Sequence, residues 1–362
     1  MPWRGGLFFC LVLASGSGLA QDTVPNIKNG TVDLAVPESP AFTVLGLTPG
    51  TVVRPASPRA LAAEVLNGVD QNGNFQTGVA IDTAPYMLFY GNRVTLEQYQ
   101  KRPLLQFLAR TQFSFATVKG SSQSDKSTRL AAGLSLTMFD KGDARLDGDF
   151  VAKLARIGQE GLAAFPPLSP LATDADLADR KKQIEQKVEM DAKPIREAKR
   201  QRSWNRSSWV LAGAPSWISP DGTTTHLHFD GAAVWSSLAY GFEGVPGLQD
   251  AAQIILHGRF HSNETVPDPE TAGNFYQQQS TVTGARMRFG TENTIGSFEV
   301  TYLHTRPVDR PTENYFRLSV GAEKRLNDNL WLHLGTGGES GRKNGKDQLF
   351  ILGAFKWGAG PK

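Results

Sequence analysis

Polar and apolar residues alternate with a period of two between Ser280 and Trp357. Alternate positions are apolar in three of the clearest stretches: Ala285, Met287 and Phe289; Phe298, Val300 and Tyr302; Phe316, Leu318, Val320 and Ala322. The positions between them are mostly polar or charged. This period is typical of strands with one apolar and one polar face, and several such strands in succession predict an antiparallel meander.

The same alternation predicts strands further upstream. They cover the stretches 77–90, 104–117, 128–139, 207–217, 224–242 and 251–261. With four strands beyond Ser280 and a last one near residues 349–357, the pattern gives about eleven strands. Pro85 is expected to mark a bulge or a strand end, because proline cannot donate a hydrogen bond to a neighbouring strand.

Between residues 142 and 206 the period becomes helical. One helix is predicted over 149–162, and a second runs from Asp174, capped by Thr173, towards Arg202, with an interruption at Pro194. The second helix carries many charges of both signs around a thin apolar stripe. It is expected to be a solvated helical hairpin, and the alternative is a docking arm for a protein partner.

Composition limits how the chain could span a membrane. It has 362 residues, of which 40% are hydrophobic, and after residue 20 no apolar run approaches the ~20 residues of a spanning helix. A β-barrel is the spanning architecture that tolerates this polarity, because only alternate residues face lipid. The net charge of +3 is too small to indicate a nucleic-acid partner.

The first 76 residues are expected to lie outside the strands. Residues 1–20 have the positive start, apolar stretch and small-residue site of a cleaved signal peptide. The single cysteine, Cys10, lies within them, so the exported chain is expected to contain no disulfide. Residues 21–76 are proline-rich with one short helix predicted over 58–66, and they fit either a periplasmic lead-in or a segment folded into a barrel lumen.

The breaks between the last strands alternate in length. The long breaks are 262–279, 306–314 and 337–346, and the short ones are 290–294 and 325–329. Outer-membrane barrels show this asymmetry between external loops and periplasmic turns. Together with the strand pattern, it makes residues 77–357 resemble bacterial outer-membrane β-barrel proteins. Such barrels usually finish on an aromatic residue, whereas residues 358–362 follow Trp357 here.

The resemblance implies an all-β fold, an antiparallel transmembrane β-barrel of about 12 strands, because the strand count of bacterial barrels is even. The barrel is expected over 77–358, with the charged α-helical insertion at 142–206. The implied location is the outer membrane, so outer-membrane lipid is the expected partner. A protein partner at the insertion is an open alternative, and no nucleic acid is expected.

Six charged residues are expected to line the interior of such a barrel. They are Arg110, Arg286, Arg288, Glu299, Arg317 and Glu323. In a barrel interior, opposite charges on adjacent strands either cross-link the sheet or line a water-filled path.

Enzymatic and metal chemistry find little support. His261-Ser262-Asn263 resembles the His-x-Ser-Asn-Gly motif of barrel phospholipases, but the spacing differs. The loop starting at Asp70 lacks the glycine and glutamate that a calcium loop needs at its sixth and twelfth positions. His226 and His228 could share a strand face, but no third ligand accompanies them. No catalytic residue, cofactor or metal is therefore predicted.

The sequence favours a passive pore or a surface scaffold in the outer membrane. One alternative is a soluble periplasmic or secreted β-rich binding protein, whose apolar strand faces would meet a protein core. A barrel lipid hydrolase built around Ser262 is a third hypothesis.

Overall fold

The computed structural model describes residues 40–45, 80–119, 127–165, 173–223, 225–242, 247–248, 251–267, 275–327, 330–341 and 348–357. All of them belong to one compact unit, Thr31–Lys362, and the other unit, Met1–Gly30, lies outside the described residues. The predicted signal peptide, the predicted helix over 58–66 and the loop starting at Asp70 lie outside them too.

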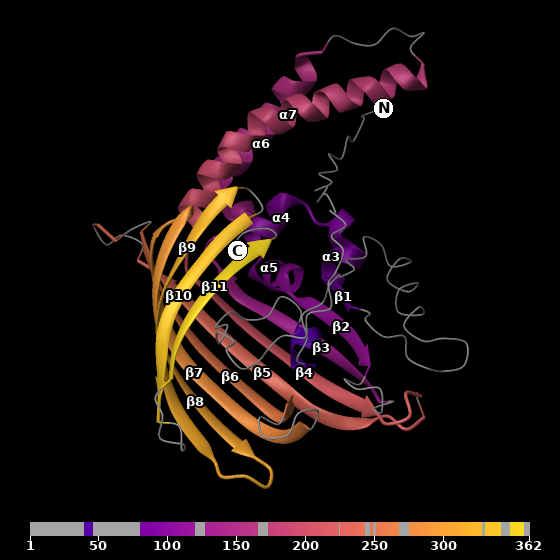
Figure 1. Cartoon of the computed structure of the whole chain (residues 1–362). Coiled ribbons are helices and arrows are strands. Elements are labelled where there is room, and N and C mark those ends of the chain that lie inside the picture. Colours follow the sequence, from indigo (N-terminus) through magenta and orange to yellow (C-terminus); the bar gives the residue numbers. More distant parts are fainter. Residues whose placement is uncertain are drawn as a thin grey trace. The chain divides into compact units, whose positions relative to one another are not determined.

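Eleven strands form one antiparallel sheet in which each strand pairs with its neighbours in sequence (Figure 1). They are β1 (Ala80–Thr83), β2 (Gln112–Lys119), β3 (Thr128–Asp140), β4 (Ser208–Ser219), β5 (His228–Gly241), β6 (Ala252–Pro267), β7 (Phe275–Thr291), β8 (Thr294–Pro307), β9 (Glu313–Asn327), β10 (Leu330–Ser340) and β11 (Gln348–Trp357). The predicted all-β class is confirmed. Within the described residues, no ladder of hydrogen bonds joins β1 to β11.

Two of the predicted strands are partly helical. The stretch 77–90 contains β1 followed by α3 (Pro85–Tyr90), and the stretch 104–117 contains α5 (Pro103–Arg110) before β2. Each helix begins with a proline, whose fixed φ and missing N–H suit the first turn. Between them lie η2 (Gly91–Arg93) and α4 (Leu96–Lys101).

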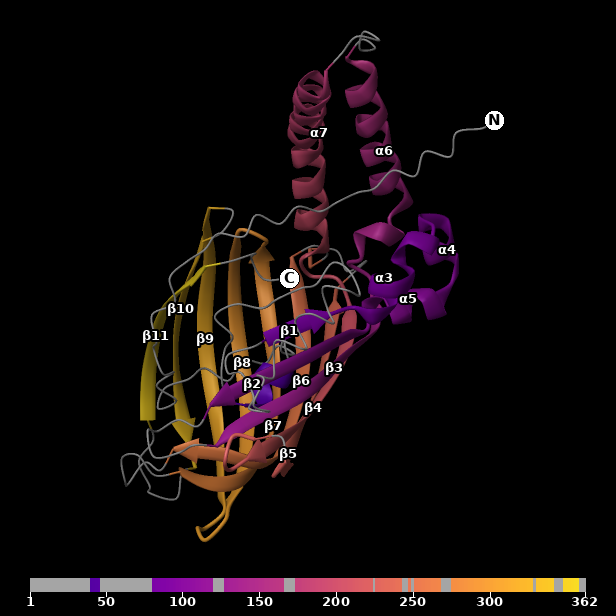
Figure 2. The same cartoon turned by 90° about the vertical axis from the view of Figure 1, so that its right-hand side faces the viewer.

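The helical stretch after β3 is a hairpin. It contains η3 (Ala144–Leu146), α6 (Gly148–Ala163) and α7 (Asp174–Ser203), and α6 and α7 lie side by side in both views (Figures 1 and 2). Thr173 caps α7 through reciprocal hydrogen bonds with Asp176. The predicted interruption at Pro194 is wrong, because α7 continues through it.

All of these helices connect strands at the same end of the sheet. The segment with α3, α4 and α5 joins β1 to β2, and the α6–α7 hairpin joins β3 to β4. Alternate connections of a meander fall at the same end, so the short connections at 292–293 and 328–329 lie there as well. We call this the turn end, and the opposite end, where β6 meets β7, the loop end.

The two faces of the sheet differ in burial. One face, here called the outer face, exposes large apolar side chains: Leu238, Tyr240, Leu256, Phe260, Met287, Phe289, Phe298, Phe316, Leu318, Val320 and Leu334. The other, the inner face, buries polar and charged side chains: Gln253, His257, Arg288, Ser297, Glu299, Arg317, Glu323 and Glu339. Cross-strand register keeps each set on its own face from β5 to β10.

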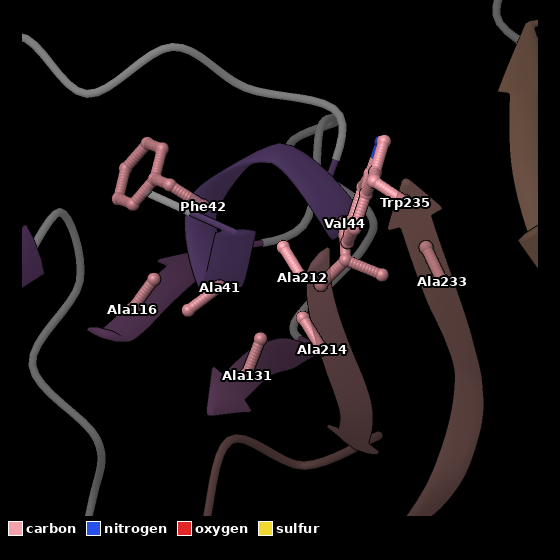
Figure 3. Close-up of a cluster of buried hydrophobic side chains, with 9 residues drawn as sticks. All are labelled: Ala41, Phe42, Val44, Ala116, Ala131, Ala212, Ala214, Ala233 and Trp235. Atoms are coloured by element: carbon pink, nitrogen blue, oxygen red, sulfur yellow. The ribbon is translucent and has the colours of Figure 1, made fainter. Parts of the chain in front are cut away.

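A short helix, α1 (Pro40–Val44), packs on the inner face of β2 to β5 (Figure 3). Its buried side chains meet a wall of small residues and one tryptophan: Ala116, Ala131, Ala212, Ala214, Ala233 and Trp235. Ala41 N donates to Ser114 Oγ at 3.0 Å. Of the two interpretations of the proline-rich segment, α1 therefore fits the one in which it lies against the inside of the sheet.

Candidate functional site

The inner face of β7 to β10 carries a wall of paired charges. Strand alternation places Arg286 on β7, Glu299 on β8 and Arg317 on β9 on the same face, because Arg286 pairs in register with Glu299 and the next inner position of β8, Thr301, pairs with Arg317. On β10, Glu339 lies opposite Arg317. Five of the six predicted interior residues lie on this wall, and the exception is Arg110.

Arg286 links three strands of this wall. Its Nη2 donates to Glu323 Oε1 on β9 at 3.0 Å and to Ser297 Oγ on β8 at 3.3 Å. Its Nε lies 3.9 Å from Glu299 Oε2. The side chains of Arg286 and Glu323 are 18% and 6% exposed, so this is a largely dehydrated ion pair whose partners compensate each other.

A second pair lies nearer the loop end. Arg317 Nε donates to Glu339 Oε1 at 2.8 Å, and Arg317 Nη2 contacts the same oxygen. Thr301 Oγ1 donates to Glu299 Oε1 at 3.1 Å. Opposite charges on neighbouring strands thus brace β9 and β10 across their inner face.

Arg288 differs from the other arginines of the wall. Its side-chain contacts are neutral: Nη1 donates to Gln253 Oε1 at 3.2 Å, and its guanidinium carbon lies 5.5 Å from the centre of the Trp204 ring. The residue is 8% exposed. Among the described residues it therefore adds a positive charge to the wall without a carboxylate in direct contact.

The wall contains polar residues that the sequence analysis did not select. His333 Nδ1 lies 3.3 Å from Glu323 Oε1 on the neighbouring strand. His333 and Glu339 occupy the inner positions of β10. Strand parity, continued along β10, places both of them on the inner face.

A further polar cluster lies on β6 and β7 near the loop end. Glu264 accepts hydrogen bonds from Ser280 Oγ at 2.6 Å and from Gln278 Nε2 at 3.2 Å. Its Oε1 lies 3.7 Å from His261 Nδ1. A bulge makes this possible, because the β6–β7 register shifts between His261 and Glu264 and Asn263 takes a positive φ of 52°.

Arg110 lies away from the wall, and its prediction as a residue of a strand is wrong. It ends α5, and its Nη2 donates to Asp143 Oδ2 at 2.8 Å. Tyr99 Oη donates to the same oxygen at 2.5 Å. Arg145 donates to both carboxylate oxygens, from Nε and Nη2, at 2.9 Å each. The cluster ties α4 and α5 to the base of the hairpin.

The pKa values of this cluster are shifted by its own contacts. Burial raises the pKa of Asp143, but hydrogen bonds from Arg145, Tyr99 and Arg110 outweigh burial and hold that pKa well below its usual range. Burial and the hydrogen bond to Asp143 raise the pKa of Tyr99 to about 12. The carboxylate is therefore the charged centre that three side chains of the turn end share.

The residues considered for catalysis do not assemble. His261 is buried on the inner face, whereas Ser262 follows it directly and points to the opposite face. Ser262 Oγ hydrogen-bonds to the backbone of Ala232, accepting from its N–H at 3.0 Å and donating to its carbonyl at 3.1 Å. A serine nucleophile needs its base within hydrogen-bond reach, and adjacent strand positions do not provide that.

Of the two histidines considered as metal ligands, His228 begins β5 and His226 lies in the turn before it. His226 Nδ1 is 2.5 Å from Asp221 Oδ2, and His228 Nδ1 is 3.3 Å from the carbonyl oxygen of His226. Within the described part of the chain, no three His, Cys, Asp or Glu side chains gather as a metal site would require.

The described part of the chain contains no helix long and apolar enough to cross a bilayer. Neither a protein-family model nor a curated protein matches this sequence.

Proposed function

We propose that this chain closes into an antiparallel β-barrel of about 12 strands in a bacterial outer membrane and acts as a passive pore. The observation that carries the proposal is the inverted burial of the sheet. On β9, Phe316, Leu318 and Val320 are 54%, 52% and 54% exposed, whereas Arg317 and Glu323 on the same strand are 8% and 5% exposed. Water-soluble sheets with one open face bury the apolar face and expose the polar one.

The apolar side chains of the outer face, most of them exposed, are continuous across strands. Leu238, Leu256, Ala285, Val300 and Leu318 follow one another in register from β5 to β9. Monomeric soluble proteins rarely expose contiguous apolar patches of more than a few hundred Å². Lipid is a medium in which such a face is stable.

The dimensions of the strands suit a bilayer. The strands β4 to β10 contain between 11 and 17 residues, and a tilted membrane strand needs about 9–11. The apolar positions of β8 end at Tyr302, and the next outward residue, His304, hydrogen-bonds to Asn314 on β9 at 2.6 Å. Lys324 bounds the band on β9 near the turn end. A band of apolar residues between polar rims is the pattern of a membrane barrel.

The charged side chains of the inner face favour a function as a pore over one as a surface scaffold. Arg286, Arg288 and Arg317 lie on the inner face of two of the strands that supply the outer apolar band. Charged side chains that line a water-filled path determine which ions pass. The proposal includes no catalytic step and no cofactor. If the lumen of the barrel is closed, the function that remains is that of a surface scaffold.

Electrophoresis of the mature chain with and without boiling tests the barrel. We expect the protein in the outer-membrane fraction and a change of mobility in SDS after boiling, because a closed ladder of hydrogen bonds resists the detergent until it is heated. Finding the chain in the soluble periplasmic fraction, with the same mobility before and after boiling, would favour the soluble binding protein.

A further inference from the structure

We infer that α1 is a built-in plug, which covers the inner face of β2 to β5 and narrows the lumen of the proposed barrel on that side. The inference rests on the proposed pore and deepens it, because it assigns the closed part of the lumen to the side formed by β2 to β5.

The two halves of the inner face differ in the size of their side chains. On β2 to β5 the inner positions under α1 are Ala116, Ala131, Ala212, Ala214 and Ala233. On β7 to β10 they include long charged side chains that reach across to the neighbouring strand. Small side chains leave room for a segment of chain inside a barrel, whereas long ones occupy that space themselves.

The fit between α1 and its wall is close. A Cβ atom at Gly133 would lie 2.6 Å from Ala41 N and 3.0 Å from Pro40 Cβ, so any larger residue at this position displaces the helix. Phe42 and Val44 are 4% and 6% exposed. In an unplugged barrel, the alanine wall and these two side chains would all face water, which the hydrophobic effect opposes.

Cysteine cross-linking tests the position of α1 in the membrane-embedded protein. Ala41→Cys combined with Ser114→Cys, in a Cys10→Ser background, places thiols on two residues in direct contact, because Ala41 N donates to Ser114 Oγ at 3.0 Å. We expect this pair to form a disulfide in outer membranes treated with a mild oxidant. Ala41→Cys with Ser319→Cys, on the charged half of the wall, is the control pair and should stay reduced. Equal cross-linking of both pairs would overturn the inference.

Conductance tests the function of α1 without altering the barrel wall. Val44→Asp puts a carboxylate into the apolar contact and should release α1, so we expect a several-fold gain in single-channel conductance. Thr43→Asp introduces the same charge at the exposed position of the helix, and its conductance should equal that of the wild type.

The change of mobility on boiling separates the two possible failures. If the wild type shows no such change, the proposed barrel fails, whatever α1 does. If the change persists in Val44→Asp while its conductance equals that of Thr43→Asp, the barrel stands and the plug is overturned.

Discussion

Arg288 is the arginine of the wall whose charge is compensated least by its direct contacts among the described residues. Arg286 is compensated by Glu323 at 3.0 Å, whereas the contacts of Arg288 are Gln253 and the Trp204 ring. A cation that is not neutralised by its neighbours sets the sign of the local potential in a confined aqueous path. The ion preference of the pore is therefore expected to depend on Arg288 more than on the paired arginines.

Replacing Arg286 and Arg288 together by glutamine should shift the ion preference towards cations. Two positive charges disappear, and the carboxylates of Glu299 and Glu323 remain on the wall. The reversal potential across a bilayer with a salt gradient measures this shift. An unchanged reversal potential would contradict the assignment of these residues to the conduction path.

The single variants separate conduction from stability. Arg288→Gln should account for most of the shift in reversal potential with little loss of thermal stability. Arg286→Gln removes the arginine of a buried ion pair, and breaking such a pair costs roughly 3–5 kcal/mol. A larger fall in melting temperature for Arg286→Gln than for Arg288→Gln is the expected result.

The Asp143 cluster should make the contact between α5 and the hairpin depend on pH. Because the folded-state pKa of Asp143 is lowered, its stabilising contribution is present above the ordinary carboxyl pKa of about 4 and is lost as the pH falls through the folded value. Because the pKa of Tyr99 is raised to about 12, the stabilisation that its hydroxyl group contributes is complete below about pH 10. This stabilisation is lost as the pH rises from about 10 to about 12. Hydrogen exchange of α4 and α5 against pH measures both losses.

Two substitutions provide the controls for this pH dependence. Asp143→Asn should abolish the acid-dependent loss of protection, because the carboxyl group that titrates is gone. Tyr99→Phe should abolish the alkaline one and leave the acid one in place. Identical pH profiles for the wild type and both variants would show that other groups govern the protection of α4 and α5.

At the scale of elements, the α6–α7 hairpin depends on one close approach. A Cβ atom at Gly161 would lie 2.5 Å from Val188 Cγ2 on α7, whereas a Cβ atom at Gly158, one turn earlier, would meet nothing within 4 Å. Gly161→Ala should force the helices apart and increase cleavage of the hairpin by protease. Gly158→Ala is the matched control and should stabilise α6 by about 0.5–1 kcal/mol, since alanine favours helix over glycine. Equal protease resistance of the two variants would contradict the close packing.

Most strands could be predicted from the sequence, whereas the helices α3 and α5 next to β1 and β2 could not. From β3 onward, each strand contains enough alternating positions for its period to be unambiguous, as in residues 128–139. The segments that follow Pro85 and Pro103 are short, so they contain few positions from which a period can be read. In the second, Leu104, Phe107 and Leu108 have the spacing of a helix, but some of the same positions also fit an alternating strand. Proline at the start of each segment was the signal for a helix, whereas Pro85 was predicted to mark a bulge or a strand end.

The position of α1 could not be predicted from local patterns. Its five residues, Pro40–Val44, are too few to define a period. Its location depends on alanines from strands β2 to β5, which are distant in sequence and come together only in the folded sheet. The charged wall was easier to predict, because strand parity alone places Arg286, Glu299 and Arg317 on a common face.

At the scale of the whole molecule, two valines distinguish lipid from water around the sheet. Val320, on the outer face of β9, is 54% exposed, and Val308, in the connection between β8 and β9, is 56% exposed. Val320→Arg should cost about 2–4 kcal/mol if its surroundings are the centre of a bilayer. Val308→Arg should cost close to nothing, because its surroundings are aqueous.

Unfolding in denaturant, from lipid vesicles, measures both costs. Similar small effects of the two arginines would show that water surrounds Val320, and the outer face would then belong to a soluble protein or to a protein interface. A clear difference between two valines of nearly equal exposure would require a different medium at Val320.

The order of the strands also has a consequence for how the chain reaches its native state. Each strand from β5 to β10 joins its successor through a connection no longer than about ten residues, so these hairpins form with a small loss of chain entropy. The connection from β3 to β4 spans 141–207, and closing it costs more. Assembly is therefore expected to proceed from the carboxy-terminal hairpins towards β1. Since α1 packs on β2 to β5, its docking would be one of the last steps, and a folding intermediate without it would already conduct.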